Sequence, residues 1–201
     1  VEVVDTVAPV DHPGPTLVFR IVPEESEARF LIDEVLAGKA TTVVGTTSAV
    51  SGEIVGDFVS PQSVAVGPIQ VDMSELRTDN SFRNRAIHDA ILQTGVEANR
   101  MAVFQLTGIE GLPTEVSFGD PYALTLSGDL TIHGVTQPVV FDAVVTAVSE
   151  SRLEGSASLS LPYSDFDIHI LRLSPQVASV GDVVTLEIDL DRKSTRLNSS
   201  H

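Results

Sequence analysis

Cysteine and tryptophan are both missing from this sequence of 201 residues, and basic residues are scarce. Without cysteine the chain has no disulfide, no thiolate nucleophile and no cysteine-ligated metal. Lys and Arg number 12 against 28 Asp and Glu, and the net charge of −16 argues against a nucleic-acid partner, because phosphate binding needs clustered positive charge. No apolar run approaches the roughly 20 residues that cross a bilayer, so we do not expect an integral membrane protein from the chain as given.

The sequence also lacks the motifs that carry common chemistry. It contains no Gly-x-Ser-x-Gly elbow for a nucleophile and no glycine-rich loop with a following lysine for phosphate. His88, His133 and His169 do not stand at the spacing of metal ligands, so we interpret them as solvated or hydrogen-bonded side chains. We therefore expect no catalytic residues, no metal site and no enzymatic activity.

What the sequence does contain is alternation between apolar and polar residues, most clearly from Tyr122 to Val148. Over residues 122–132 every second residue is apolar or glycine, as in a strand with one buried face. A run rich in Val and Phe follows from Pro138 to Val148, and a proline at the first position of a strand costs no ladder hydrogen bond. The two runs predict a long antiparallel hairpin joined by residues 133–137.

Similar alternation elsewhere, with turn signals between the runs, predicts eight or nine strands between residues 17 and 190. Gly45 and Gly52 predict bends or bulges within one of these runs. N-cap residues at 78–81, followed by apolar residues at helical spacing, predict one helix-containing insertion near residues 80–94. The pattern is typical of an all-β antiparallel fold, and we predict an eight-stranded barrel because closure removes exposed strand edges.

The two ends of the chain differ from this domain. Residues 1–15 contain Pro9, Pro13 and Pro15 with little periodicity, which predicts a flexible N-terminal arm or linker. Residues 191–201, DRKSTRLNSSH, break from the acidic alternating pattern and match the in-frame translation of a common short-read sequencing adapter. We therefore assign residues 16–190 to the barrel domain and interpret residues 191–201 as foreign to the natural protein. A functional basic tail is the alternative interpretation.

The predicted inner faces of the strands leave two alternatives for the interior of the barrel. Small residues such as Ala28, Gly128 and Gly155 leave volume for one small ligand, and a dry elongated cavity would suit a hydrocarbon chain. In the other alternative, the interior is filled by phenylalanine side chains, namely Phe30, Phe104, Phe141 and Phe166.

Four arginines gather on or beside the predicted helix, namely Arg77, Arg83, Arg85 and Arg100. One interpretation is that they pair with the carboxylates close by in the sequence, namely Asp72, Glu75, Asp79, Asp89 and Glu97. The other interpretation places Arg83 or Arg85 at the mouth of the barrel. A planar guanidinium there can bind a polar ligand head while its stem covers apolar surface.

Four segments match, in order, the motifs of a known family. The most recognisable is GDLTIHGVTQPVVFD at residues 128–142, and the others are VPEESEARF (22–30), TDNSFRNRAI (78–87) and SDFDI (164–168). On these segments the chain resembles the YceI-like family of bacterial polyisoprenoid-binding proteins. Three places depart from the family pattern: Ala86 stands where a histidine is common, Asp167 replaces a glycine, and Ala98-Asn99-Arg100 lacks the usual Tyr-Pro before Phe104.

The resemblance covers roughly Leu17 to Leu190 and implies a lipocalin-like barrel whose apolar interior holds an isoprenoid tail, with no catalytic residues. As ligand-binding residues of the interior we carry over only the positions that match the strand pattern, namely Phe30, Ile69, Val71, Phe104, Leu124, Leu126, Leu130, Phe141 and Phe166. Arg83 and Arg85 are the expected contacts for a head group.

The implied partner is an isoprenoid or other long-chain lipid, such as a quinone, with no further cofactor. The resemblance also implies a periplasmic or secreted setting in a bacterium. For assembly, a homodimer is one alternative. For function, the alternative is a barrel without a ligand that serves a structural role or binds other proteins.

Overall fold

The computed structural model describes residues 16–170 and 177–196, and one antiparallel sheet dominates them. Residues 1–15, the predicted arm, and 197–201 lie outside the described residues. In the described part of the chain the sheet has twelve strands. In chain order they are β1 (Leu17–Ile21), β2 (Glu27–Leu36), β3 (Lys39–Thr47), β4 (Val50–Ser51), β5 (Glu53–Gly56), β6 (Ala65–Val66), β7 (Ile69–Asp72), β8 (Met101–Glu110), β9 (Pro121–Ile132), β10 (Val135–Ser149), β11 (Arg152–Pro162) and β12 (Val177–Arg196).

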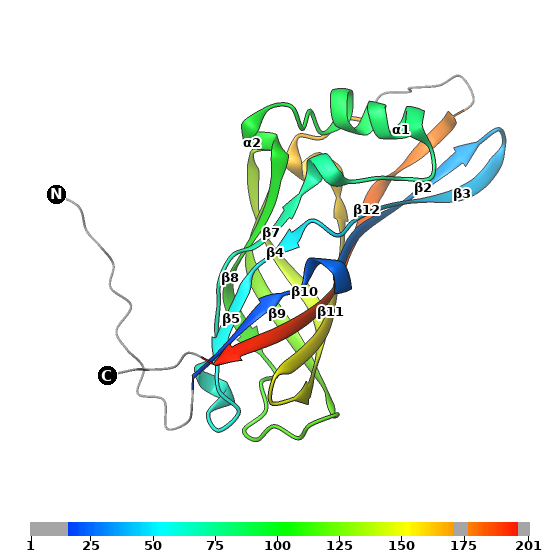
Figure 1. Cartoon of the computed structure of the whole chain (residues 1–201). Helices are drawn as coiled ribbons and strands as arrows, with labels where there is room; N and C mark the ends of the chain where they lie inside the picture. The colour runs from blue at the N-terminus through cyan, green and yellow to red at the C-terminus, as the bar shows by residue number, and fades with distance from the viewer. Residues whose placement is uncertain (1–15, 171–176, 197–201) are drawn as a thin grey trace.

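The sheet curls into a nearly closed barrel, which confirms the predicted all-β antiparallel architecture (Figure 1). Its strand order is β4-β7-β8-β9-β10-β11-β12-β1-β5-β6, and β2 and β3 join it through β12. Opposite β12, the end of β3 meets the chain again at Arg77, because Thr46 and Arg77 exchange backbone hydrogen bonds of 2.8 and 2.9 Å. This short contact therefore continues the barrel wall from β3 to the segment that contains Arg77.

The long strand β12 organises the barrel because two different strands pair with its two halves. Residues 177–189 pair with β2, residues 192–196 pair with β1, and β11 lies along the other side. The predicted domain boundary after Leu190 therefore falls inside this strand. Asp191 is buried, and its backbone carbonyl accepts a hydrogen bond of 2.9 Å from the N–H of Val22.

More strands are present than the predicted eight because two predicted runs are broken into short pieces. Gly52 separates β4 from β5, as predicted, and a Cβ there would lie 2.6 Å from Cδ1 of Ile69. Gly45, in contrast, lies inside the regular strand β3, directly opposite Phe30 of β2. The β2–β3 register passes this glycine without a shift, so the predicted bend or bulge is absent there.

The hairpin of β9 and β10 is tighter than its sequence predicted. Ile132 pairs with Val135, so the turn consists only of His133 and Gly134, with φ of 52° and 74°. Two positive φ values are the mark of the type I′ turn that matches strand twist. Pro138 consequently lies inside β10, and the strand tolerates it because β11 pairs with β10 only from Asp142 onward.

The predicted helical insertion is present. Asn80 caps helix α1 (Ser81–Ala86) by accepting hydrogen bonds from the N–H groups of Phe82 and Arg83, and a π-helical turn η4 (Ile87–Ile91) continues it. The remaining helical elements are short, namely η1 (Pro23–Glu25), η2 (Pro61–Ser63), η3 (Met73–Glu75), α2 (Glu97–Arg100) and η5 (Tyr163–Phe166). In the described ranges, no helix has the length and apolar character needed to cross a membrane.

Candidate functional site

The inward-facing side chains of β9 differ in burial along the strand. Leu130 and Ile132, at the end of the strand beside the helices, are buried. Leu124 and Leu126 lie on the same face but are only half-buried, and both line an internal cavity. Since neighbours on one face differ in this way, the exposure of the second pair arises from space inside the barrel.

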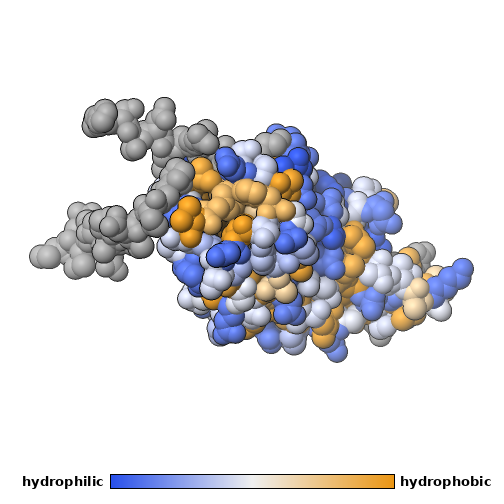
Figure 2. Space-filling view, turned by 90° about the horizontal axis from the view of Figure 1, so that it is seen from below, coloured by the Kyte–Doolittle hydropathy of each residue, from blue (hydrophilic) through white to orange (hydrophobic). Residues whose placement is uncertain are grey.

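The lower cavity, in the orientation of Figure 1, has a volume of about 280 Å³. Its wall is formed by inward side chains of the strands, and loops at its lower end contribute side chains such as Phe58, Pro61 and Leu112. Phe58 is stacked edge to face against Phe19 and Phe118, with ring centroids 5.8 and 5.2 Å apart. Apolar side chains also gather on the surface at this end (Figure 2).

The upper cavity has a volume of about 810 Å³ and lies beneath the helical insertion. Its wall comes from the projecting parts of β2, β3 and β12 and from η3, α1, η4 and η5, which cross this end of the barrel (Figure 1). This wall is mostly apolar, but it also carries polar and charged side chains, namely Glu34, Asn80, Arg83, Arg85, Asp89 and Tyr163. Burial, together with the nearby Asp182, raises the pKa of Tyr163.

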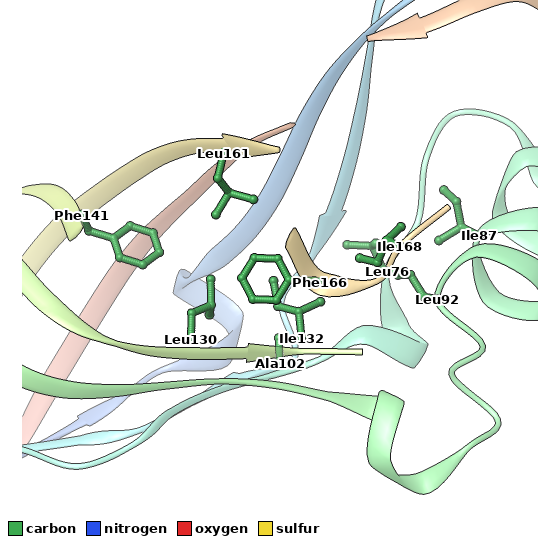
Figure 3. Packing of buried hydrophobic residues seen from close by; sticks show 10 residues of the cluster. All are labelled: Leu76, Ile87, Leu92, Ala102, Leu130, Ile132, Phe141, Leu161, Phe166 and Ile168. Carbon is green, nitrogen blue, oxygen red and sulfur yellow. The ribbon is translucent and has the colours of Figure 1, made fainter. Parts of the chain in front are cut away.

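Five side chains belong to the walls of both cavities. We call this set the neck, and it consists of Phe30, Met73, Leu76, Ile132 and Leu186. It lies within the largest cluster of buried apolar residues, in which the ring of Phe166 lies between Phe141 and Ile87 (Figure 3). The barrel interior therefore contains two largely apolar chambers that share these five side chains.

Two of the phenylalanine rings lie against glycines of the wall. A Cβ on Gly45 would come within 2.2 Å of Cε1 of Phe30, and a Cβ on Gly128 within 2.5 Å of Cε2 of Phe104. Phe104 also packs edge to face on Phe141, with ring centroids 5.1 Å apart. The sequence left two alternatives, an interior filled by phenylalanine and an interior with space for a ligand. Each holds in part, because phenylalanine rings occupy the space over the glycines while two cavities remain.

All of the predicted interior residues line one chamber or both. Phe30 lines both, Phe166 lines the upper one, and the others line the lower one, namely Ile69, Val71, Phe104, Leu124, Leu126, Leu130 and Phe141. Arg83 and Arg85 lie on the wall of the upper chamber. That these side chains bind a ligand stays a prediction.

The four arginines near the helix were predicted to pair with nearby carboxylates or, for Arg83 or Arg85, to line the mouth of the barrel, and both arrangements occur. Arg83 donates from Nη2 to Oε1 of Glu34 at 2.9 Å and from Nη1 to Oδ1 of Asp79 at 2.6 Å, while it also lines the upper chamber. Arg100 pairs with Asp72 at 2.8 Å. Arg85 is exposed and makes no ion pair with any residue in the described ranges, so it is the arginine of this chamber that is free to meet a ligand.

Glu34 is the residue at this site that the sequence prediction missed. It is buried at 7 % exposure on the wall of the upper chamber, where Arg83 compensates its charge. The signal was available, because Glu34 continues the inward alternation of Ala28, Phe30 and Ile32 by one more step of two. A charge in such a row needs a partner, since burying an unpaired carboxylate is costly.

The histidines show no common site. His88 Nε2 lies 2.8 Å from the carbonyl oxygen of Leu76, and His169 lies 3.2 Å from Asp167, which agrees with the predicted hydrogen-bonded role. His133, in contrast, has two buried ring nitrogens without a hydrogen-bond partner among the residues described. Nowhere in ranges 16–170 and 177–196 do three His, Asp or Glu side chains gather as metal ligands would.

Solved structures with this architecture include a polyisoprenoid binding domain from Saccharophagus degradans, which shares 14% identity at a TM-score of 0.71 and covers 88% of this chain and 98% of that one. BcnA of Burkholderia cenocepacia shares 14% identity at a TM-score of 0.63, covering 85% and 98%. The YCEI protein of Campylobacter jejuni shares 19% at a TM-score of 0.58, covering 76% and 85%. None of the curated proteins matches the chain.

The sequence itself matches one family model, described as the YceI-like domain, over residues 19–191. This range begins in β1, ends in β12 and includes every strand between them. The chain therefore belongs to the YceI-like domain family.

Proposed function

We propose that the protein binds a polyisoprenoid or similar long-chain amphiphilic lipid inside the barrel, to carry or sequester it. The observation that carries this proposal is the pair of apolar chambers that meet at the neck. Burying a hydrocarbon tail there gains roughly 0.8 kcal/mol per CH₂ group removed from water. The structural similarity to a polyisoprenoid binding domain supports the same ligand class.

The distribution of polar groups along the barrel favours one orientation of the ligand. Arg85, Asn80 and the Glu34–Arg83 pair lie on the upper wall, where a polar head finds hydrogen-bonding partners. On the lower wall, Arg29 and Glu187 pair with each other at 2.6 Å. The buried Asp57 on the same wall accepts hydrogen bonds from the N–H groups of Val59 and Ser60. The head group therefore lies in the upper chamber, and the tail reaches through the neck toward the lower one.

A periplasmic or secreted location is part of the same proposal. A cysteine-free chain is compatible with an oxidising compartment, where unpaired thiols would be oxidised. Fractionation of cells that express the gene with its native upstream sequence tests this location.

Native mass spectrometry of the purified protein tests the ligand directly. We expect a mass increment that disappears after organic extraction, an isoprenoid lipid in the extract, and renewed binding when a prenyl quinone is added back. Failure of the extracted protein to bind any prenyl lipid would contradict the proposal.

A matched pair of variants on β9 locates the binding. Leu126→Glu places a charge on the lower-chamber wall, so we expect it to abolish loading. Ala123→Glu lies on the opposite, exposed face, directly across from Val144, and should load as the wild type does. Ala157→Phe reduces the volume of the same chamber without burying a charge, so loss of loading by this variant cannot be attributed to a buried carboxylate. Equal loading by all three variants would place the ligand elsewhere.

The alternative function, a structural or protein-binding barrel without a ligand, makes the opposite prediction. Such a barrel gains no stability from prenyl lipids, whereas a ligand that binds only the folded state raises the melting temperature as its concentration rises. A melting temperature that stays constant over a wide range of lipid concentration would favour the alternative.

A further inference from the structure

The neck is not uniform, because two of its five side chains are buried and three are only half-buried, namely Phe30, Met73 and Leu186. Leu76 and Ile132 are buried at 4 and 7 % exposure within the largest apolar cluster. Phe30 is only half-buried although it points inward, because its ring borders open space in both chambers. Since Phe30 lines both chambers, a shift of its ring changes the space between them.

The ring of Phe30 is held against the wall by its cross-strand partner Gly45. The two residues are directly opposite in the β2–β3 ladder, and the ring occupies the space where a side chain at position 45 would stand. A Cβ there would lie 2.2, 2.7 and 2.9 Å from Cε1, Cζ and Cδ1 of Phe30. Any residue larger than glycine would push the ring away from β3 and toward the passage.

Gly128 also has an aromatic ring over it, but movement of that ring alone would not make room for a side chain there. A Cβ on Gly128 would meet the ring of Phe104 and also the backbone oxygen of Gln105, both at 2.5 Å. Since Gln105 lies in the neighbouring strand β8, a side chain at position 128 would disturb the ladder itself. At Gly45 the three nearest atoms all belong to the outer part of one movable side chain.

We propose that Phe30 determines how long a tail the barrel accepts, and that Gly45 keeps the passage open by giving the ring a place against the wall. This inference rests on the proposed lipid-binding function and adds a specificity-determining residue to it. With the ring on Gly45, a long tail passes the neck into the lower chamber. With the ring displaced, the tail is confined to the upper chamber.

The test measures dissociation constants for quinones whose tails contain one, two, four and eight isoprene units. In the wild type, affinity should rise with tail length. In Gly45→Ala it should stop rising once the tail fills the upper chamber, and the longest tail should bind at least about tenfold more weakly than to the wild type, because its end stays in water. The shortest tail should bind both proteins equally.

Two further variants isolate the ring as the cause. Gly95→Ala adds a methyl group where nothing lies within 4 Å of it, so it should keep the wild-type length profile. Adding Phe30→Leu to Gly45→Ala removes the displaced ring, so the double variant should recover long-tail affinity. Circular dichroism spectra and melting curves establish that each variant is folded.

The outcomes separate the two proposals. If the wild type binds no quinone of any length, the proposed function is wrong. If the wild type binds quinones and Gly45→Ala shows the same dependence on tail length, Phe30 does not set the length limit. The same conclusion follows if the folded double variant with Phe30→Leu does not recover long-tail affinity. In both cases only this inference is overturned.

Discussion

At the residue scale, Asp72 links the lumen wall to the helical end of the barrel. It ends β7 and caps η3, accepting hydrogen bonds from the N–H and hydroxyl of Ser74 at 2.9 and 2.6 Å. Arg100 donates to its other oxygen at 2.8 Å. The bond from Arg100, followed by those from Ser74, lowers the pKa of Asp72 from its usual 3.8 to about 2.

Because the folded state lowers this pKa, Asp72 stabilises the fold fully above about pH 4, and the contribution is lost as the pH falls toward 2. We expect Asp72→Asn to reduce the free energy of unfolding by about 1–2 kcal/mol at pH 7, in the range of a lost N-cap with one charged hydrogen bond. In urea denaturation at a series of pH values, the difference from wild type should shrink from pH 4 to pH 2. Asp129→Asn, on the exposed face, is the control, and a difference that stays constant with pH would contradict the assignment.

At the element scale, the β9–β10 hairpin depends on a two-residue turn with both φ values positive. We expect Gly134→Ala to destabilise the protein by about 1–2 kcal/mol, the cost of a left-handed conformation for a residue with a Cβ. The cause would be conformational, because a Cβ at this position has only an ordinary contact at 3.5 Å with Asn99 Oδ1.

Urea denaturation of Gly134→Ala, with Gly95→Ala as the control, measures this cost. His133→Asn should be neutral or stabilising, since asparagine adopts positive φ more readily than histidine. Equal stabilities for the two Gly→Ala variants would show that the turn does not constrain the hairpin.

The β9–β10 hairpin shows which features of the fold could be predicted from the sequence and which could not. Period-two alternation predicted which face of β9 points inward, because a buried face must be apolar whatever its neighbours are. The turn was predicted too long because Pro138 was taken as a strand start, whereas the open edge of β10 accommodates it. The neck could not be predicted, because it depends on the register that places Phe30 opposite Gly45 and on η3 lying over the barrel end.

At the scale of the whole molecule, β12 continues beyond the predicted domain end. Asp191 accepts a hydrogen bond from Arg152, and its backbone N–H donates to the hydroxyl of Ser26 at 3.0 Å. The backbone of residues 192–196 pairs with β1. Pairing of this kind needs only backbone groups, so it does not decide whether residues 191–201 are natural, and their origin as adapter translation stays a prediction.

Two truncations test the contribution of this strand end. A chain that ends at residue 196 should melt at the wild-type temperature. A chain that ends at residue 190 should melt lower by at least several degrees, because β1 loses one of its two neighbours and Arg152 loses its buried partner. Differential scanning calorimetry measures both, and equal melting temperatures for the two chains would mean that residues 191–196 add nothing to the barrel.

From the pairing of β12 with both β1 and β2 we infer an order of folding. Ser26 and Asp191 are 165 residues apart in the sequence, yet they are hydrogen-bonded neighbours in the wall. Contacts at such separations form late, because the chain must close a very long loop before they contribute any stability. While the protein is being synthesised, the β9–β10–β11 meander can form early, but the wall remains an open sheet until the final strand has left the ribosome. The enclosed interior is therefore the last feature of this molecule to exist, and until then its apolar face is available to chaperones.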